Sequence, residues 1–234
     1  MARNEGVGHR PGDARSERPA GIITRQGPAP AFPSFHETTP ALAPMPADLD
    51  LKHWPLPYEE SLELRPPAAI ELVVLHCTEL PDLATAREYG ERVLYADSGT
   101  GNSGHYYVDR DGTVHRYVAH DRIAHHTRGY NPRSIGIELV NAGRWPHWLD
   151  SRHQAMDEAY TEAQIEALAA LLRKLKVELP SLRGIAGHED LDTTEMEASD
   201  DPSMKVRRKR DPGPLFPWPR VLAASGLERI DIPN

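Results

Sequence analysis

Hydrophobic runs predict five strands in the middle and C-terminal parts of the chain. They cover residues 69–76, 104–110, 113–118, 134–140 and 183–186. The first run, AIELVVLH, is continuous and rich in β-branched residues, which is typical of a strand buried on both faces. The second and third runs flank Asp111-Gly112, a pair that favours positive φ and therefore predicts a tight hairpin.

Helical periodicity predicts three helices among these strands. One helix is expected over 83–94 and a closing helix over 217–224. Between them, Thr161 and Gln164 form a capping box for a helix whose apolar positions from 165 to 175 share one face. The order of elements predicts an α/β (mixed) fold, in which a central mixed β-sheet is flanked by helices.

The distribution of proline divides the chain. Twelve of the 22 prolines lie before residue 68, where no periodicity extends beyond a few residues, so we expect a disordered Pro-rich N-terminal tail. Scattered apolar residues just before residue 68 favour an arm that lies on the domain surface. The predicted divisions are a disordered tail at 1–47, an extended arm at 48–67, a compact domain at 68–226 and a C-terminal tail at 227–234.

Composition and charge narrow the class of protein. Hydrophobic residues at 39% and charged residues at 26% indicate a soluble globular domain, and a net charge of −8 argues against nucleic acid or anionic membranes as main partners. No apolar stretch approaches the roughly 20 residues of a membrane span, and none follows the N-terminal charges as in a secretory signal. We therefore expect a cytoplasmic protein, or a periplasmic or secreted one if the natural N-terminus differs. The oligomeric state stays open.

Two short motifs lack the context that their chemistry needs. Residues 99–104 spell G-x-G-x-x-G, but a predicted helix precedes them and a hairpin follows, whereas a dinucleotide site needs a strand before and a helix after. His188-Glu189 begins like a zincin helix, yet position 192 is Asp instead of the second His. Neither nucleotide binding nor a zincin site is expected.

Histidines at the ends of predicted strands are the remaining candidates for a functional site. His76 ends the first predicted strand and His188 follows the last one, and strand ends are where such sheets place ligands. A catalytic zinc needs three protein ligands, and Asp211 is a candidate for a carboxylate ligand. Spacing alone does not select these three residues in a chain with 12 histidines.

Five segments occur in the order of a known enzyme family: VVLHCTE, SGHYYVDRDGTVHRYV, HHTRGYNPRSIGIELVNAG, AGHEDLD and KRDPGPLFPW. Together they resemble the zinc-dependent N-acetylmuramoyl-L-alanine amidases of the type 2 amidase family, which are relatives of the peptidoglycan-recognition proteins. The resemblance covers about residues 69–224 and implies the peptidoglycan-recognition-protein-like amidase fold. It also implies peptidoglycan fragments or murein as partners, and hydrolysis of the amide bond between N-acetylmuramic acid and L-alanine in peptidoglycan or muropeptides.

The resemblance implies a role for each matching residue. His76, His188 and Asp211 match the ligands of Zn2+. Glu138 matches the catalytic glutamate, which would take a proton from water and return it to the leaving amine, and Lys209 matches a lysine that would stabilise the oxyanion. The candidate substrate contacts are His126, which the family match suggests, His105 at the start of the hairpin, and Asn131 and Arg133, whose side chains suit carboxylates.

Several alternatives stay open. Asp190 or Asp192 could replace Asp211 as the third ligand, and Glu138 could instead form a structural ion pair with an arginine such as Arg133. The protein could also be a non-catalytic peptidoglycan-binding module of the same fold, or a cysteine hydrolase that uses Cys77 with His188, although strand alternation favours a buried and inert Cys77. A long polar loop is expected over 187–214, and its part between His188 and Asp211, residues 189–210, is either a solvated loop or a lid over the cleft.

Overall fold

The computed structural model describes residues 49–230. The tail predicted at 1–47 lies outside the described residues, as do residues 231–234. Among the described residues, no helix combines the length and the apolar character that a membrane span requires.

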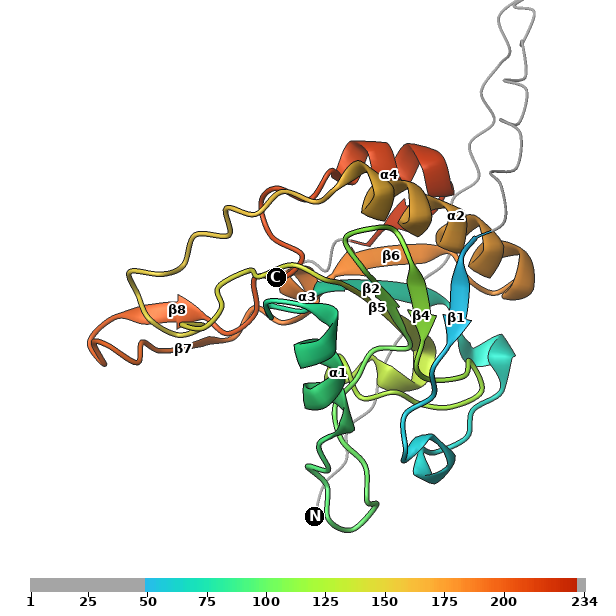
Figure 1. Cartoon of the computed structure of the whole chain (residues 1–234), viewed down its shortest axis with the longest axis horizontal. Coiled ribbons are helices and arrows are strands. Elements are labelled where there is room, and N and C mark those ends of the chain that lie inside the picture. Colours follow the sequence, from blue (N-terminus) through green and yellow to red (C-terminus); the bar gives the residue numbers. More distant parts are fainter. Residues whose placement is uncertain (1–48, 231–234) are drawn as a thin grey trace, which may run out of the picture. The chain divides into compact units, whose positions relative to one another are not determined.

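A seven-stranded mixed sheet forms the centre of the described region (Figure 1). Its spatial order is β1-β4-β3-β5-β2-β6-β9, and every neighbouring pair is parallel except β3 and β4, which form the predicted hairpin. The strands are β1 (Leu51–His53), β2 (Leu72–Cys77), β3 (Tyr106–Val108), β4 (Val114–Arg116), β5 (Ser134–Leu139), β6 (Gly184–Gly187) and β9 (Glu228–Arg229). The predicted mixed sheet flanked by helices is confirmed.

Helices cover both faces of this sheet. Figure 1 shows α2 (Glu162–Glu178) and α4 (Trp218–Ser225) on one side of the sheet and α1 (Leu83–Glu91) on the other. The capping box predicted for α2 is present, because the Thr161 side chain accepts a hydrogen bond from the Gln164 N–H and the Gln164 side chain accepts one from the Thr161 N–H. Short helical turns lie at η1 (Glu59–Ser61), η2 (Pro67–Ala69), η3 (Asn131–Arg133) and α3 (His188–Leu191).

Side-chain alternation along β2 determines which face of the sheet His76 points to. Val73 and Leu75 belong to the main core beneath α2, whereas Leu72 and Val74 pack on the opposite face of the sheet. His76 continues the series of Leu72 and Val74, so its side chain points away from α2. Every residue of β2 is buried, as the continuous apolar run predicts.

The sheet extends past both predicted limits of the compact domain. In the arm, β1 pairs in parallel with β4, and Leu56 and Leu62 are buried. At the other end, β9 pairs with β6, so residues 228–229 form a strand where a tail was expected. Strands of three and two residues are too short to produce a recognisable period, which is why the hydrophobic pattern misses them.

The segment over 187–214 is not the continuous loop that its polarity predicts. It contains α3 and a two-stranded antiparallel hairpin, β7 (Glu195–Glu197) and β8 (Lys205–Arg207), which projects from the body of the domain (Figure 1). The register sets Glu195 opposite Arg207 and Glu197 opposite Lys205. Opposite charges therefore pair across the hairpin, and the acidic and basic halves of the segment are its two strands.

Candidate metal centre and active site

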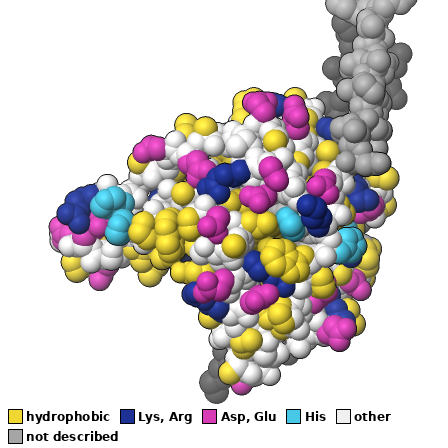
Figure 2. Space-filling view, in the orientation of Figure 1, with side chains coloured by type: hydrophobic (Ala, Val, Ile, Leu, Met, Phe, Trp, Pro, Cys, Tyr) yellow, Lys and Arg dark blue, Asp and Glu magenta, His cyan; other side chains and the backbone are white. Residues whose placement is uncertain are grey.

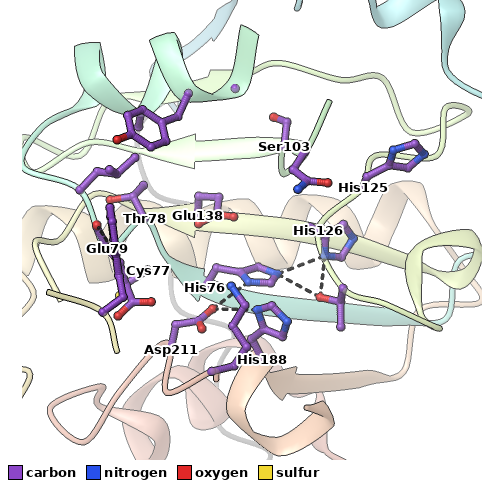
Figure 3. Close-up of a pocket in the computed structure, with 18 of the residues that line it drawn as sticks. His76, Cys77, Thr78, Glu79, Ser103, His125, His126, Glu138, His188 and Asp211 are labelled. Carbon is purple, nitrogen blue, oxygen red and sulfur yellow. Dashed lines mark hydrogen bonds and ion pairs between the residues drawn. The ribbon is translucent and has the colours of Figure 1, made fainter. Parts of the chain in front are cut away.

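Three residues converge at the carboxyl ends of neighbouring parallel strands. His76 lies near the end of β2, His188 follows β6 directly, and Asp211 lies in the loop before α4 (Figure 3). The Asp211 Oδ2 atom is 2.9 Å from His76 Nδ1 and 3.1 Å from His188 Nδ1. All three side chains are buried, and one ligand atom from each lies within 4.8 Å of the others.

The chemistry of this cluster fits a metal ion. Burial and the neighbouring His188 lower the pKa of His76 to about 4, so its imidazole is neutral near pH 7, as a metal ligand requires. Burial alone would raise the pKa of Asp211, but the facing His188 and hydrogen bonds from both histidines hold it well below its usual range. Asp211 Oδ1 and His188 Nε2 are buried without a hydrogen-bond partner among the described residues. Two imidazoles and one carboxylate, with a position left open, are a donor set typical of catalytic zinc.

Glu138 lies beside this cluster because of strand register. On adjacent parallel strands, Glu138 of β5 is paired with His76 of β2, so both side chains point to the same face. Burial raises the pKa of Glu138 well above its usual value, Asp211 raises it further, and Lys209 opposes both effects. A Cβ atom at position 104 would lie 2.9 Å from the Glu138 Cγ, so Gly104 leaves room for this carboxylate. A half-buried carboxyl group with a raised pKa is suited to proton transfer near neutral pH.

Lys209 contributes positive charge to the same pocket. It is half-buried, lies two residues before Asp211, and lines the pocket together with the three clustered residues. Its ammonium lowers the pKa of Glu138 as well as that of His76. The arrangement therefore combines a candidate metal site, a candidate base and a cation.

His126 and Asn131 occupy one wall of this pocket. His126 Nδ1 lies 3.1 Å from His76 Nε2, and the two rings meet edge to face (Figure 3). Asn131 Oδ1 accepts hydrogen bonds from the backbone N–H groups of His126 and Thr127, at 3.1 and 2.7 Å, so it orders the loop that carries His126. Gly136 makes space for the imidazole, because a Cβ atom there would lie 2.5 Å from the His126 ring.

The other two predicted substrate contacts lie outside the pocket. His105 is fully buried, and its Nδ1 accepts a hydrogen bond from the Gly136 N–H at 3.0 Å. Arg133 is exposed and donates to Glu71 at 2.5 Å, so it neither lines the pocket nor pairs with Glu138. Backbone and ion-pair partners hold these side chains away from the pocket, and their role as substrate contacts stays a prediction.

The alternative metal ligands, Asp190 and Asp192, have other partners, and the alternative nucleophile, Cys77, is buried. Asp190 accepts from the Gly187 N–H and from Arg229, and Asp192 forms an ion pair with Arg208. Cys77 is buried, and burial together with Glu79 raises the pKa of its thiol well above the usual value. A thiol that stays protonated is a poor nucleophile, which argues against the cysteine hydrolase.

The pocket around the cluster is open and about 900 Å³ in volume. Figure 2 shows hydrophobic side chains gathered between the projecting hairpin and the body of the domain. Residues that the sequence did not single out also line the pocket, namely Thr78, Glu79, Tyr95, Ser103, Arg128, Arg144, Trp148, Met196 and Arg208. They come from β7 and from loops far apart in the sequence, so no local spacing signals them.

The fold and this site agree with a family comparison. The sequence profile of the Amidase 2 family, described as N-acetylmuramoyl-L-alanine amidase, matches residues 66–214. The chain belongs to this family, which confirms the resemblance carried by the five sequence segments.

Individual relatives point the same way. The chain is 34% identical over 134 residues to the 1,6-anhydro-N-acetylmuramyl-L-alanine amidase AmpD of Salmonella typhimurium (strain SL1344), a match of 53% of this chain and 58% of that protein. It thus spans little more than half of that relative. Among solved structures, the endolysin N-acetylmuramoyl-L-alanine amidase LysCS from Clostridium intestinale URNW is 20% identical with a TM-score of 0.53, over 79% of this chain and 98% of that one.

A second similar structure is the E. coli N-acetylmuramyl-L-alanine amidase AmiD in complex with the substrate anhydro-N-acetylmuramic acid-L-Ala-D-gamma-Glu-L-Lys. It is 24% identical with a TM-score of 0.51, and the match covers 70% of this chain and 59% of that one. At these identities, the two structural similarities concern the fold.

Proposed function

We propose that the protein hydrolyses the amide bond between N-acetylmuramic acid and L-alanine in peptidoglycan or muropeptides, in a reaction that depends on Zn2+. The observation that carries the proposal is the convergence of His76, His188 and Asp211, whose ligand atoms lie within 4.8 Å of one another in a buried cluster. Membership of the amidase family supports the choice of bond.

His76, His188 and Asp211 would hold the metal. When bound, Zn2+ supplies Lewis acidity, which lowers the pKa of a coordinated water from about 15.7 towards 7. The neutral imidazole of His76 and the ionised carboxylate of Asp211 are the protonation states that such binding needs.

Glu138 would transfer the protons of the reaction, and Lys209 would stabilise the negative charge. Glu138 accepts the proton of the attacking water and later delivers it to the nitrogen of the leaving L-alanine. Its raised pKa favours the second step, because the protonated carboxyl group is a usable acid near neutral pH. Lys209 faces the carbonyl oxygen of the scissile bond and stabilises the negative charge that develops there.

His126 and Asn131 would shape the binding of the muramyl group. His126 presents its ring at the pocket wall beside His76, and Asn131 fixes the backbone of that loop. The relative AmpD is named as a 1,6-anhydro-N-acetylmuramyl-L-alanine amidase, which supports muropeptides as substrates, and polymeric peptidoglycan stays an alternative. The cytoplasmic location stays a prediction.

The test is incubation with a purified disaccharide tetrapeptide, with and without a chelator, followed by mass spectrometry. We expect free peptide with an N-terminal alanine only in the samples without chelator, and recovery after zinc is added back. Binding of the muropeptide without cleavage in any sample would favour a non-catalytic peptidoglycan-binding module instead.

A further inference from the structure

A buried ion pair joins two loops that border the pocket. Glu79 lies just after β2 and Arg144 lies in the loop after β5. The Arg144 Nε donates to Glu79 Oε1 at 2.6 Å and Nη2 donates to Glu79 Oε2 at 2.9 Å, which makes a two-point contact. The two side chains are only 1% and 8% exposed, in the order Arg144 and Glu79.

Of the remaining donors of Arg144, one on Nη1 reaches Gln154 Oε1 at 3.2 Å, and the others reach a third segment. Nη1 donates to the carbonyl oxygen of Arg207 at 2.8 Å, and Nη2 donates to that of Arg208 at 3.2 Å. A guanidinium presents five N–H donors in a rigid plane, so it can hold a carboxylate and two backbone carbonyls at the same time. We call Glu79, Arg144 and these two carbonyl groups the Arg144 clamp.

The clamped segment leads directly into the candidate active site. Lys209 follows Arg208, and Asp211 lies two residues later. Residues 205–210 contain five cationic side chains, which repel one another, so this stretch depends on partners elsewhere in the fold to hold one conformation, among them β7 and Asp192. The far end of the β7–β8 hairpin has a separate anchor, since Asp200 accepts hydrogen bonds from the Ser151 N–H and hydroxyl.

We propose that Arg144, oriented by Glu79, is a positioning residue that fixes the backbone of Arg207 and Arg208 and thereby places Lys209 at the candidate metal centre. The catalytic half of this inference rests on the proposed function. The clamp itself is a property of the folded chain and is testable without substrate or metal.

A second arginine–glutamate pair provides a matched control. Arg110 contacts Glu158 through two hydrogen bonds, at 2.6 and 3.1 Å, and also donates to a backbone carbonyl, that of Pro81. It makes no contact with residues 205–211 among the described residues. Arg110→Lys therefore removes a comparable two-point contact to a glutamate and leaves the Arg144 clamp intact.

Limited trypsin digestion tests the clamp directly, because residues 205–210 are rich in trypsin sites. In metal-free protein we expect Arg144→Lys to be cut within 205–210 about tenfold faster than wild type, since local opening governs cleavage. Cleavage at Lys174 in α2 reports global unfolding and is expected to stay unchanged, as is every rate in Arg110→Lys. Equal rates at 205–210 in wild type and Arg144→Lys would overturn the clamp. If Arg144→Lys does not fold, Glu79→Gln serves in its place.

Kinetics test whether the clamp acts through Lys209. On a muropeptide, Arg144→Lys is expected to lower kcat about tenfold or more and to change KM by less than about twofold, with the zinc content retained. In a Lys209→Met background the same substitution should lower kcat little further, because the two residues act as one unit. If Arg144→Lys lowered kcat by the same factor in wild type and in Lys209→Met, the two residues would act independently, and the clamp would not act through Lys209. If wild type hydrolyses nothing, the proposed function fails, while the trypsin comparison still decides the clamp.

Discussion

Glu138 and His76 stand side by side in parallel register on β5 and β2, so a carboxylate and an imidazole project from the same face at the ends of two central strands. Rigid strands hold both groups, whereas Asp211 and Lys209 come from a loop. The division suggests that the base and one metal ligand are placed by the sheet, and that the remaining groups need separate anchors.

Replacing Glu138 separates proton transfer from metal binding. Glu138→Gln should retain zinc but lower kcat by about 10² to 10⁴, the usual contribution of general acid–base catalysis. Zinc content by elemental analysis and turnover on a muropeptide check this. Glu71→Gln, which removes an exposed carboxylate outside the pocket, should leave both unchanged. A near-wild-type rate for Glu138→Gln would mean that another group is the base.

Replacing His76 should remove metal and activity together. His76→Ala takes away one of three ligands from a buried cluster, so we expect no bound zinc after dialysis and no turnover. Zinc should raise the melting temperature of wild type and of Glu138→Gln, but not that of His76→Ala. His53→Ala, at an exposed histidine in β1, serves as the control. Full zinc binding by His76→Ala would contradict the ligand assignment.

The single cysteine, Cys77, should be dispensable for catalysis. The thiol of Cys77 is buried and its pKa is raised well above the usual value, so it stays protonated. Cys77→Ala should keep turnover within about threefold of wild type, while a chelator abolishes turnover in both proteins. Loss of activity in a folded Cys77→Ala protein that still binds zinc would restore the cysteine hydrolase.

Gly136 should be intolerant of even a methyl group. A Cβ atom there would lie 2.5 Å from the His126 ring, so Gly136→Ala must displace that imidazole or the strand. We expect a loss of about 1 to 3 kcal/mol in the free energy of unfolding and impaired turnover. Gly90→Ala in α1, where the nearest atom is 3.6 Å away, should be neutral or stabilising. Denaturant titration compares the two, and equal stabilities would refute the packing argument.

Long elements with a strong period were predictable from the sequence. The apolar run around His76 makes β2 buried on both faces, and the capping residues Thr161 and Gln164 mark the start of α2. The five family segments imply site roles for His76, Glu138 and Asp211, and the structure brings these three side chains to one pocket.

Contacts between distant loops were not predictable in the same way. Glu79 and Arg144 are 65 residues apart, and neither lies in a periodic element. His105 and Arg133 do not line the pocket, and residue type alone does not reveal that a backbone N–H holds the His105 ring and that Glu71 holds the Arg133 side chain. Tertiary contacts, which the sequence does not reveal, determine where these side chains lie.

The most direct test of the central claim is turnover of a disaccharide tetrapeptide in oxygen-18 water by the zinc-reconstituted protein, with mass analysis of both products. We expect one heavy oxygen in the muramyl carboxylate and a free peptide that begins with unlabelled L-alanine, with neither product formed by the metal-free protein. Cleavage at any other bond, or equal turnover without zinc, would contradict it.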